Sequence, residues 1–458
     1  MTNVVLVYPR FKYPSGDIPY GLSTIASFVR EETDANVSIL DTTFHPSFEY
    51  VRSFLKREKP DIVGIYVNTI AIYDALEVAK IAKNYSSFVI MGGPHATILP
   101  NTLIGNDNVD AVAIGEGEIT FREIIERFQK DEKLNGVKGI WFKENGNIIK
   151  GPMRCPIKDL DSLPFPAWDL LDMKKYIKNW FSLDSVNPNL NGVNIMGSRG
   201  CPFNCTYCQP TLRKIFGEKV RLRSPENVIN EIKTLKRLYN IDAFYFLDDT
   251  LTAFRKWILK FCELIKNEKI IWGCNTRANT IDKNLMKIMR KAGLRKIAIG
   301  AESASQYILD NIYNKGIKVE DVRRTVKNAK ELGIKTRVFF MLGAPRETRD
   351  EIKKTIKFAI SLDADEATFS MTVPLPETYL YDFVKQSGWK LSDNFEDFDY
   401  YSKRAFFDNS LDAKELSRFQ KMAFFSFYTH PKRWLYLFKS FSSLRATKKL
   451  RLKLKRIF

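Results

Sequence analysis

The sequence predicts an α/β protein in which a doubly wound parallel sheet precedes a partial (β/α)6 barrel and a helical, basic C-terminal extension. Short apolar runs alternate with helical spacing through the N-terminal third of the chain, and the same alternation resumes at residue 193. The final stretch, 431–458, holds ten lysines and arginines and no acid. We therefore expect domains at 1–135 and 191–385, a connector at 136–190 and the extension at 386–458.

The first domain contains five apolar runs that predict buried strands, at 3–8, 37–40, 62–67, 88–91 and 111–114. Helical spacing separates them, at 21–31, 48–56, 70–83 and 118–130. Ligands bind outside the carboxyl ends of the strands in such a sheet. Glycines in the strand-end turns would let the backbone approach a large ligand, although tight strand-to-helix connections use glycine in the same way.

The connector begins with a predicted hairpin. Two short apolar runs flank Asn145-Gly146, a dipeptide typical of hairpin turns. A proline-bearing stretch, 156–166, then leads away. Cys155 has no partner nearby in sequence, which favours a buried or free thiol over a metal ligand.

The second domain contains six strand-like runs, at 193–196, 243–247, 270–272, 296–299, 337–342 and 367–371. Helices are expected between them, at 225–239, 254–267, 283–292, 319–332 and 349–362. Six strands are too few to close a full eight-stranded barrel, so we expect a partial barrel with its site at the carboxyl ends of the strands.

Three cysteines follow the first barrel strand in the pattern C-x3-C-x2-C, at Cys201, Cys205 and Cys208. Thiolates are the ligands that iron–sulfur clusters and zinc select. An iron–sulfur cube held by three thiolates leaves one iron open to an outside ligand, because such clusters normally take four.

Two other uses of these thiols are weaker. A structural zinc site would need a distant fourth ligand such as Cys155 or Cys274, because no histidine lies between His95 and His430. Disulfides are disfavoured, since six cysteines in a long chain with no secretory signal indicate a reducing compartment.

The loop, with Tyr207 as an aromatic residue just before the third cysteine, resembles the hallmark of the radical S-adenosylmethionine enzymes. The resemblance implies that Cys201, Cys205 and Cys208 hold a [4Fe-4S] cluster whose open iron binds S-adenosylmethionine. In that family the reduced cluster cleaves S-adenosylmethionine to a 5'-deoxyadenosyl radical, with an external electron donor of the flavodoxin or ferredoxin type.

The same resemblance extends to the other strand ends. It implies that Asp248 or Asp249 holds the amino group of S-adenosylmethionine. The strand end Gly300-Ala301-Glu302-Ser303 resembles the family's Gly-x-Glu-Ser pattern, which implies a place near the ribose and carboxylate. The turn at Gly343 is implied to shape the adenine pocket. The S-adenosylmethionine contacts implied are Tyr207, Asp248, Asp249, Arg277, Glu302, Ser303 and Gly343. Each acid taken alone could equally be a helix cap or a surface carboxylate.

Three motifs of the first domain, 19–22, 92–97 and 114–118, resemble the cobalamin-binding domain that precedes many such enzymes. The positions implied to line cobalamin are Tyr20, Gly21, Asn68, Thr69, Gly92, Gly93, Gly115 and Glu116. No Asp-x-His-x-x-Gly motif follows the first strand, so we expect no histidine at the lower face of the cofactor. His95 could contact the cofactor, but a local hydrogen bond is the favoured interpretation.

Charge and hydropathy constrain partners and location. The chain has 72 Lys and Arg against 53 Asp and Glu, a net charge of +19, which suits an anionic partner or a basic surface. The tail suits a helix on an anionic membrane surface, a solvated terminus or nucleic acid. No apolar run could span a bilayer and no signal peptide is recognisable, so a cytoplasmic protein is expected, with peripheral contact at the inner membrane face as an alternative.

The leading function is a cobalamin-dependent radical S-adenosylmethionine methyltransferase that methylates an unactivated carbon of a hydrophobic substrate. The alternative is a non-methylating cyclisation, oxidation or carbon–carbon coupling of a lipid, isoprenoid or tetrapyrrole. A third candidate is a basic nucleic-acid-binding metalloprotein, although residues 1–154 lack the cysteines that methylthiolating tRNA enzymes carry there. The scattered Cys155, Cys262 and Cys274 argue against a second metal centre.

Overall fold

The computed structural model describes residues 2–12, 16–85, 87–401, 404–408, 411–433 and 447. The chain divides into two units. The first comprises the residues up to 176 together with 211–221, and the second comprises 177–210 and the residues from 222 onward. The basic tail beyond residue 433 therefore lies outside the described residues, apart from Thr447.

The first unit is built on a seven-stranded sheet in the order β2-β1-β3-β4-β5-β6-β7. Its parallel strands are β1 (Asn3–Tyr8), β2 (Asn36–Asp41), β3 (Ile62–Tyr66), β4 (Phe88–Gly92) and β5 (Ala111–Ala113). The strand order reverses beside β1, as in doubly wound sheets that bind a ligand at this switch point. The predicted hairpin forms as β6 (Ile140–Glu144) and β7 (Asn147–Lys150), and it extends the sheet by pairing antiparallel with β5.

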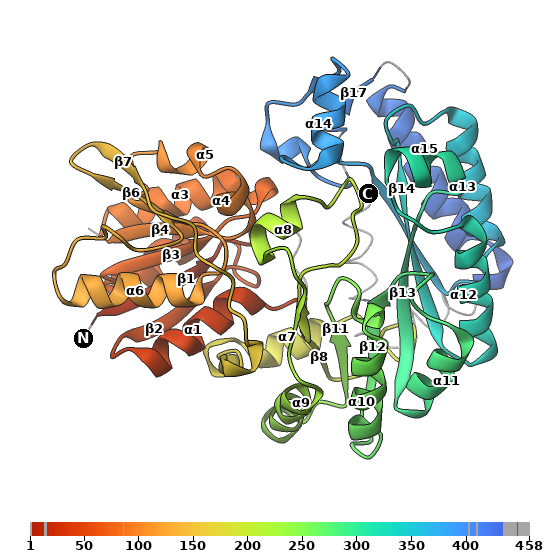
Figure 1. Ribbon diagram of the computed structural model, residues 1–458, viewed down its shortest axis with the longest axis horizontal. Coiled ribbons are helices and arrows are strands. Elements are labelled where there is room, and N and C mark those ends of the chain that lie inside the picture. The colour runs from red at the N-terminus through yellow and green to blue at the C-terminus, as the bar shows by residue number, and fades with distance from the viewer. Residues whose placement is uncertain are drawn as a thin grey trace. The chain divides into compact units, whose positions relative to one another are not determined.

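Helices cover both faces of this sheet, with α1 and α6 packed together on one face and α3 on the other (Figure 1). Helix α2 packs against α3. Their bounds are α1 (Tyr20–Glu32), α2 (Phe48–Glu58), α3 (Ile72–Lys83) and α6 (Glu118–Gln129), with the shorter α4 (Pro94–Ile98), α5 (Asn101–Ile104) and α8 (Thr211–Phe216). Gly64 on β3 is required by this packing, because a Cβ there would lie 2.9 Å from the Phe121 ring of α6. The boundary between the two units falls within helix α7 (Met173–Asn179), after Tyr176.

The second unit contains six parallel strands that follow one another in chain order across the sheet. They are β8 (Gly192–Ile195), β11 (Ala243–Phe246), β12 (Ile271–Thr276), β13 (Leu294–Glu302), β14 (Lys335–Leu342) and β15 (Glu366–Met371). Strands β8 and β15 are the two edges among the described residues, so the sheet is a partial barrel. The predicted fold class is thereby confirmed.

The outer layer of the barrel consists of the five predicted helices, arranged around the curled sheet (Figure 1). They are α9 (Pro225–Tyr239), α10 (Arg255–Ile265), α11 (Lys283–Lys291), α12 (Val319–Glu331) and α13 (Arg349–Ser361). On β14 every second side chain is buried: Phe340 contacts Phe358 of α13 at 6.3 Å between ring centroids, whereas Phe339 and Met341 are only half-buried. The half-buried set therefore lies on the inner face of the sheet, away from the helices.

The extension adds α14 (Tyr379–Gln386) and α15 (Ala413–Tyr428), with the two-residue strands β16 (Lys390–Leu391) and β17 (Phe406–Phe407). Two further short strands, β9 (Ser198–Arg199) and β10 (Arg221–Leu222), flank the cysteine loop and α8 in sequence. Phe424 and Phe427 of α15 pack on Phe369 of β15, at 5.3 and 6.1 Å between ring centroids. These aromatic contacts therefore pack α15 against the sheet.

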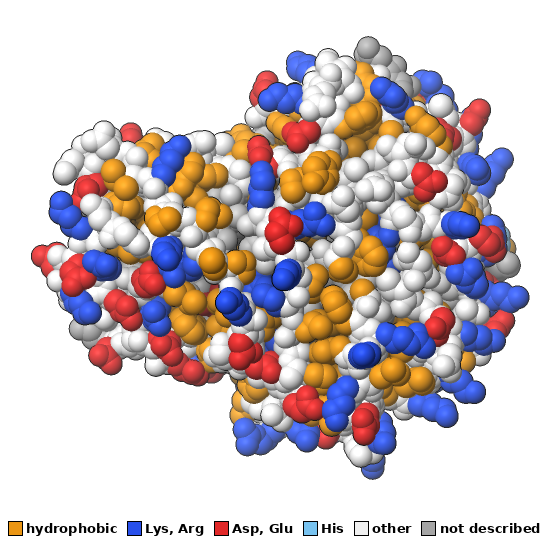
Figure 2. Space-filling model, in the orientation of Figure 1, with side chains coloured by type: hydrophobic (Ala, Val, Ile, Leu, Met, Phe, Trp, Pro, Cys, Tyr) orange, Lys and Arg blue, Asp and Glu red, His pale blue; other side chains and the backbone are white. Residues whose placement is uncertain are grey.

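On the face shown in Figure 2, lysines and arginines are interspersed with acids, and no single basic patch dominates. Within the described part of the chain, none of the helices has the length and apolar character needed to cross a membrane.

Candidate active site

The cysteine loop leaves the carboxyl end of β8 and folds into a tight turn. The carbonyl of Cys205 accepts hydrogen bonds from the backbone N–H groups of Cys208 at 3.1 Å and Gln209 at 2.9 Å. Thr206 anchors the turn, because its N–H donates to the Tyr313 carbonyl at 3.0 Å and its hydroxyl to the Ile312 carbonyl at 2.6 Å. The three thiols are therefore carried by one well-fixed loop at the mouth of the barrel.

The surroundings of the thiols differ. Cys205 is buried, whereas Cys201 and Cys208 are half-buried. Burial raises the pKa of the Cys201 and Cys208 thiols. Arg277, at the end of β12, donates from Nη1 to Cys205 Sγ at 3.2 Å.

Asp248 and Asp249 follow β11 and have different environments. Asp248 is buried, and its two carboxylate oxygens accept from the N–H of Gly197 at 3.1 and 3.0 Å. The Ser198 hydroxyl also donates to it. Burial raises the pKa of Asp248 to about 6. Asp249 is exposed, although the surrounding protein and then the Asp248 charge raise its pKa as well. Asp248 thus fixes the start of the cysteine loop, and Asp249 is the acid that faces solvent.

Glu302, at the end of β13, forms a buried cluster with Lys315 and Tyr207. Lys315 Nζ lies 2.7 Å from Glu302 Oε1 and 2.9 Å from the Tyr207 hydroxyl, which in turn lies 3.3 Å from Glu302 Oε1. Glu302 has a φ of 64°, in the left-handed region, beside a register shift between β13 and β14. Such strain persists where the surrounding structure fixes it, often at a functional site.

Gly300 is required by this cluster, because a Cβ there would lie 2.5 Å from Glu302 Oε1 and 2.8 Å from Lys315 Nζ. Ser303 is directed elsewhere: its hydroxyl accepts from the N–H of Ser305 at 3.0 Å and lies 3.4 Å from the Thr355 hydroxyl of α13. Lys315 was missed by sequence reasoning, since no motif surrounds it and its partner Glu302 comes 13 residues earlier.

The turn after β14 depends on Gly343, with a φ of 78°. Glu347 is fully buried and accepts from the N–H groups of Gly343 at 2.6 Å and Ala344 at 3.0 Å. Burial raises the pKa of Glu347 to about 8. The next helix is capped by Thr348 and Glu351, whose side chains each accept from the other residue's backbone N–H.

In the first unit, the expected cobalamin positions lie at the carboxyl ends of the parallel strands. Tyr20 and Gly21 begin α1, and the Asn68 side chain caps the short turn that contains Thr69. Gly92 ends β4, and Gly93 has a φ of 112°, where a Cβ would lie 2.9 Å from the Val67 carbonyl. These glycines keep the strand ends open to close approach.

The β4 and β5 loops are tied together, because the N–H of Gly115 donates to the Thr97 hydroxyl at 3.0 Å. His95 is fully buried, 3.2 Å from the Thr69 hydroxyl and 2.9 Å from the Thr102 hydroxyl. Burial lowers the pKa of His95 to about 4, so the imidazole is neutral. These contacts agree with the local interpretation of His95.

Glu116, another of the expected cobalamin positions, binds a residue from beyond the cysteine loop. Its carboxylate forms a bidentate pair with Arg221, at 2.8 and 2.9 Å, and accepts from the N–H of Ile157 at 2.8 Å. Arg221 also donates to the carbonyls of Ile157 at 2.5 Å and Phe216 at 2.7 Å. The segment 211–221, which we call the strap, is therefore fastened to the first unit, with α8 against α4.

Comparisons with known proteins match both units. Residues 195–359 match the radical SAM superfamily, and residues 15–125 match the B12 binding domain. An uncharacterized methyltransferase of Pyrococcus horikoshii is 39% identical over 423 residues, which cover 90% of this chain and 88% of that protein. The anaerobic magnesium-protoporphyrin IX monomethyl ester cyclase of Rubrivivax gelatinosus is 32% identical over 417 residues, covering 87% and 71%.

The chain belongs to the radical S-adenosylmethionine enzymes with a B12-binding domain. Solved structures of this enzyme class share the fold. The methyltransferase TsrM of Kitasatospora setae aligns with a TM-score of 0.71 at 17% identity, covering 87% of this chain and 85% of that one. The cobalamin-dependent enzyme OxsB aligns with a TM-score of 0.67 at 22% identity, covering 88% and 57%.

As a radical S-adenosylmethionine enzyme, the protein uses a [4Fe-4S] cluster and S-adenosylmethionine, and its first domain binds cobalamin. It acts on a small molecule and needs an electron donor. The cysteine loop fits a cluster, because it carries three free thiols on one hydrogen-bonded turn and a cubane takes each thiolate on a different iron.

The remaining cysteines of this radical S-adenosylmethionine enzyme are dispersed. Cys155 is exposed in the first unit, Cys262 is buried in α10 and Cys274 is buried in β12. The distant fourth zinc ligand considered from sequence would have to come from these, and within the described residues none of them joins a metal-binding group.

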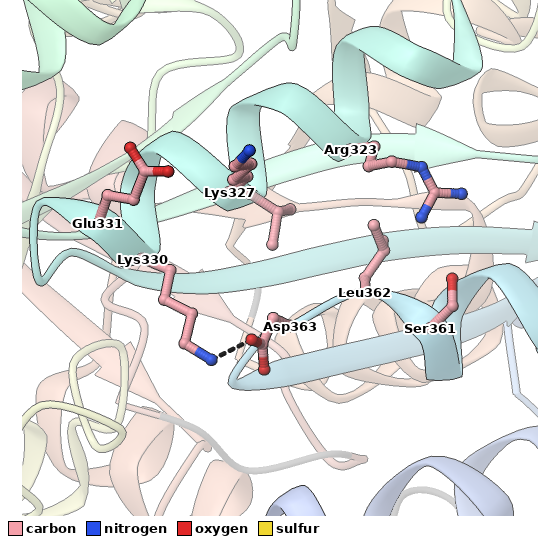
Figure 3. Close-up of a pocket in the computed structure, with 8 residues that line it drawn as sticks. Arg323, Lys327, Lys330, Glu331, Ser361, Leu362 and Asp363 are labelled. Carbon is pink, nitrogen blue, oxygen red and sulfur yellow. Dashed lines mark hydrogen bonds and ion pairs between the residues drawn. The ribbon is translucent and has the colours of Figure 1, made fainter.

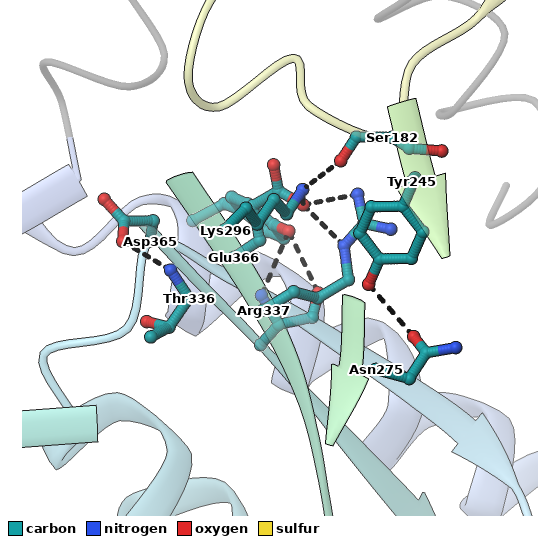
Figure 4. Close-up of polar contacts among 10 residues, drawn as sticks. Ser182, Tyr245, Asn275, Lys296, Thr336, Arg337, Asp365 and Glu366 are labelled. Carbon is teal, nitrogen blue, oxygen red and sulfur yellow. Dashed lines mark hydrogen bonds and ion pairs between the residues drawn. The ribbon is translucent and has the colours of Figure 1, made fainter. Parts of the chain in front are cut away.

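The inner wall of the barrel carries a buried charged group that the sequence did not reveal (Figure 4). Lys296 of β13 lies 2.9 Å from Glu366 of β15, and Nε of Arg337 on β14 lies 2.5 Å from the same carboxylate. Lys296 also donates to the Ser182 carbonyl at 2.8 Å. Residues from three different strands form this group, so no local sequence motif predicts it.

A hollow of about 550 Å³ lies on the outer helical layer of the enzyme, between α12 and the end of α13 (Figure 3). Its lining residues are Arg323, Val326, Lys327, Lys330, Glu331, Ser361, Leu362 and Asp363. Lys330 and Asp363 form an ion pair across it. None of the expected site residues lines this hollow, which separates it from the cysteine loop.

Proposed function

We propose that the enzyme methylates an unactivated carbon of a hydrophobic small molecule, with cobalamin as the methyl carrier. The main support is that one chain contains both domains. The same chain is 39% identical, over nine-tenths of its length, to a protein named as a methyltransferase. Phe339 and Met341, half-buried on the inner face of β14, support an apolar substrate.

In this proposal Cys201, Cys205 and Cys208 hold the cluster. Asp249 accepts the ammonium group of S-adenosylmethionine, because it is the exposed acid at its strand end while Asp248 is occupied by the loop. The Glu302–Lys315–Tyr207 cluster and the turn at Gly343 line the rest of this cofactor. Ser303 contributes through the α13 packing that orders the Glu302 strand end.

When bound, the cluster with S-adenosylmethionine supplies the radical that removes a hydrogen atom, and cobalamin supplies the methyl group. The protein's own residues bind, orient and exclude water. For cobalamin we assign the strand-end set of Tyr20, Gly21, Asn68, Thr69, Gly92, Gly93 and Gly115. Glu116 acts there through Arg221, because its carboxylate is occupied by the strap.

A second candidate is ring closure on a tetrapyrrole. It is favoured by the 32% identity to an anaerobic magnesium-protoporphyrin IX monomethyl ester cyclase, of which this chain covers 71%. Both candidates use the same cluster loop. They differ in whether a methyl group is transferred to the substrate. Ring closure would remove hydrogen from the substrate without adding a carbon.

The first test is the metal content of protein purified without oxygen and reconstituted with iron, sulfide and hydroxocobalamin. About four irons per chain are expected for a cubane, with one cobalt. Cys205→Ala should lose the iron chromophore, whereas Cys262→Ala, which removes an equally buried thiol from α10, should keep it. Zinc without iron would contradict both candidates.

Methyl-labelled S-adenosylmethionine then separates the candidates. The loaded enzyme is incubated with reductant and a lipid and tetrapyrrole extract, and products are followed by mass spectrometry. Label incorporated into a product supports methyl transfer. Loss of hydrogen from a substrate, with no label incorporated, supports ring closure. About four irons per chain with no cobalt in the metal analysis would also support ring closure.

We also propose that a flavodoxin- or ferredoxin-type protein is the electron donor and that the tail contacts an anionic membrane. The net charge of +19 and the basic residues of 431–458 other than the buried Arg433 support both. The full chain should sediment with phosphatidylserine vesicles, whereas a chain ending at residue 433, which keeps the buried Arg433, should stay in solution. Equal binding of both chains would contradict the membrane contact.

A further inference from the structure

The Arg277 side chain contacts the cysteine loop and residues next to it through hydrogen bonds and an aromatic ring. Its side chain lies at the end of β12 in a residue that is 5% exposed. Nη1 donates to Cys205 Sγ at 3.2 Å, Nη2 donates to the Lys315 carbonyl, and Nε donates to Asn279 Oδ1 at 3.4 Å. All three nitrogens of the guanidinium therefore have a protein partner.

The plane of the guanidinium is fixed as well. Its central carbon lies 3.7 Å from the ring centroid of Phe203, between the first and second cysteines of the loop. A cation stacked on a partly buried ring at this distance is attracted by the ring's quadrupole. Phe203 and Cys205 thus hold Arg277 from two points of one loop.

This geometry gives Arg277 a different task from the S-adenosylmethionine contact that the family resemblance implies. Its donors are directed at the loop and at the backbone of Lys315, and the guanidinium carries a positive charge. A positive charge therefore lies permanently beside one of the three thiols.

Hydrogen bonds to the sulfurs and the local dielectric set the reduction potential of an iron–sulfur cluster. One-electron reduction adds negative charge, and a buried cation stabilises that charge more than a solvated one does. We propose that Arg277 is a positioning residue that fixes Cys205 and raises the reduction potential of the cluster bound there. It thereby sets how strong a one-electron donor the enzyme requires.

The inference rests on the proposed cluster ligands Cys201, Cys205 and Cys208. Its test is an electron paramagnetic resonance titration of the reduced cluster in the reconstituted full-length protein, with iron and sulfide content measured on the same samples. The midpoint potential measured in this way does not depend on whether the enzyme transfers a methyl group. A wild-type protein that binds no iron would overturn the proposed function, whereas an unchanged potential would overturn only the role of Arg277.

Arg277→Gln removes the charge, and we expect its midpoint potential to be clearly more negative than that of wild type. Arg277→Lys keeps the charge and should restore the potential toward the wild-type value. Lys283→Gln is the control, because it removes a cation from the exposed surface of α11; its potential should equal that of wild type.

Phe203→Leu covers the case in which Arg277→Gln binds no iron. It removes the stacking face while leaving the cation, so a smaller negative shift is expected. Equal potentials in wild type and in every iron-loaded variant at these two positions would overturn the proposal.

Discussion

Lys315 Nζ lies 2.7 Å from Glu302 Oε1, and the two side chains are only 7% and 9% exposed. The pair joins the end of β13 to the segment before α12, and Tyr207 of the cysteine loop completes it. A buried carboxylate that loses its partner is costly, of the order of 3–5 kcal/mol. This contact therefore connects the cysteine loop to the strand end expected to bind S-adenosylmethionine.

Lys315→Met should weaken S-adenosylmethionine binding and lower stability, because it leaves the Glu302 carboxylate buried without its ammonium partner. Calorimetric titration of the reconstituted protein with S-adenosylmethionine measures the first effect, and urea unfolding the second. Lys318→Met, which changes an exposed lysine three residues later, is the control. Equal binding in both variants would show that the pair plays no part in the cofactor site.

Gly343→Ala should destabilise the second unit by about 1–3 kcal/mol. The residue has a φ of 78°, and a Cβ would lie 2.6 Å from Leu416 of α15. Gly333→Ala is a matched control, since its φ is 65° but nothing lies within 4 Å of the added Cβ. Thermal unfolding should show a larger loss for the first variant, and an equal loss in both would mean that α15 yields to the methyl group.

Glu347 predicts a pH dependence of stability. Burial raises its folded pKa to about 8, so in the folded state the carboxyl holds a proton that the unfolded chain releases near its ordinary, lower pKa. The folded state then binds more protons, and stability falls as the pH rises from that ordinary value toward 8, by at most about 1.4 kcal/mol per pH unit.

Glu347→Gln keeps an oxygen for the N–H groups of Gly343 and Ala344 while removing the ionisation. Urea unfolding between pH 5 and pH 8 should therefore give a flatter profile for the variant than for wild type. Parallel profiles would mean that the carboxyl is ionised in the fold throughout this range.

Arg221→Ala should release the strap and weaken cobalamin binding, because the Glu116 carboxylate loses its bidentate partner at the strand-end loops. Arg221→Lys should recover only part of the effect, since an ammonium cannot form the two parallel hydrogen bonds. Absorption titration with hydroxocobalamin gives the affinity. Arg213→Ala on the same strap is the control, as its carboxylate partner Glu218 is mostly exposed; equal affinities in all variants would argue against a role for the strap.

Local patterns gave most of the fold from sequence. All strands of the parallel sheets and all five barrel helices were predicted, because the spacing of apolar residues that indicates a strand or helix lies within one contiguous segment. The ends were less accurate: β12 and β13 extend beyond the predicted runs, as far as Thr276 and Glu302, because polar residues interrupt the apolar signal there. The short α4, α5 and α8 were missed, since a helix of so few residues leaves little periodic pattern.

The sequence by itself determined the enzyme class, because the cysteine loop and the glycine-rich turns are contiguous motifs whose spacing carries the chemistry. Only the tertiary structure decided which of Asp248 and Asp249 is hydrogen-bonded to the cysteine loop. It also decided which groups Arg277 contacts and what Glu116 binds. Those contacts join residues 51, 72 and 105 positions apart. The first two pairs meet because parallel strands bring their carboxyl ends to one edge of the barrel, and the third forms because the strap returns to the first unit after the cysteine loop. No local sequence pattern predicts contacts between residues so far apart.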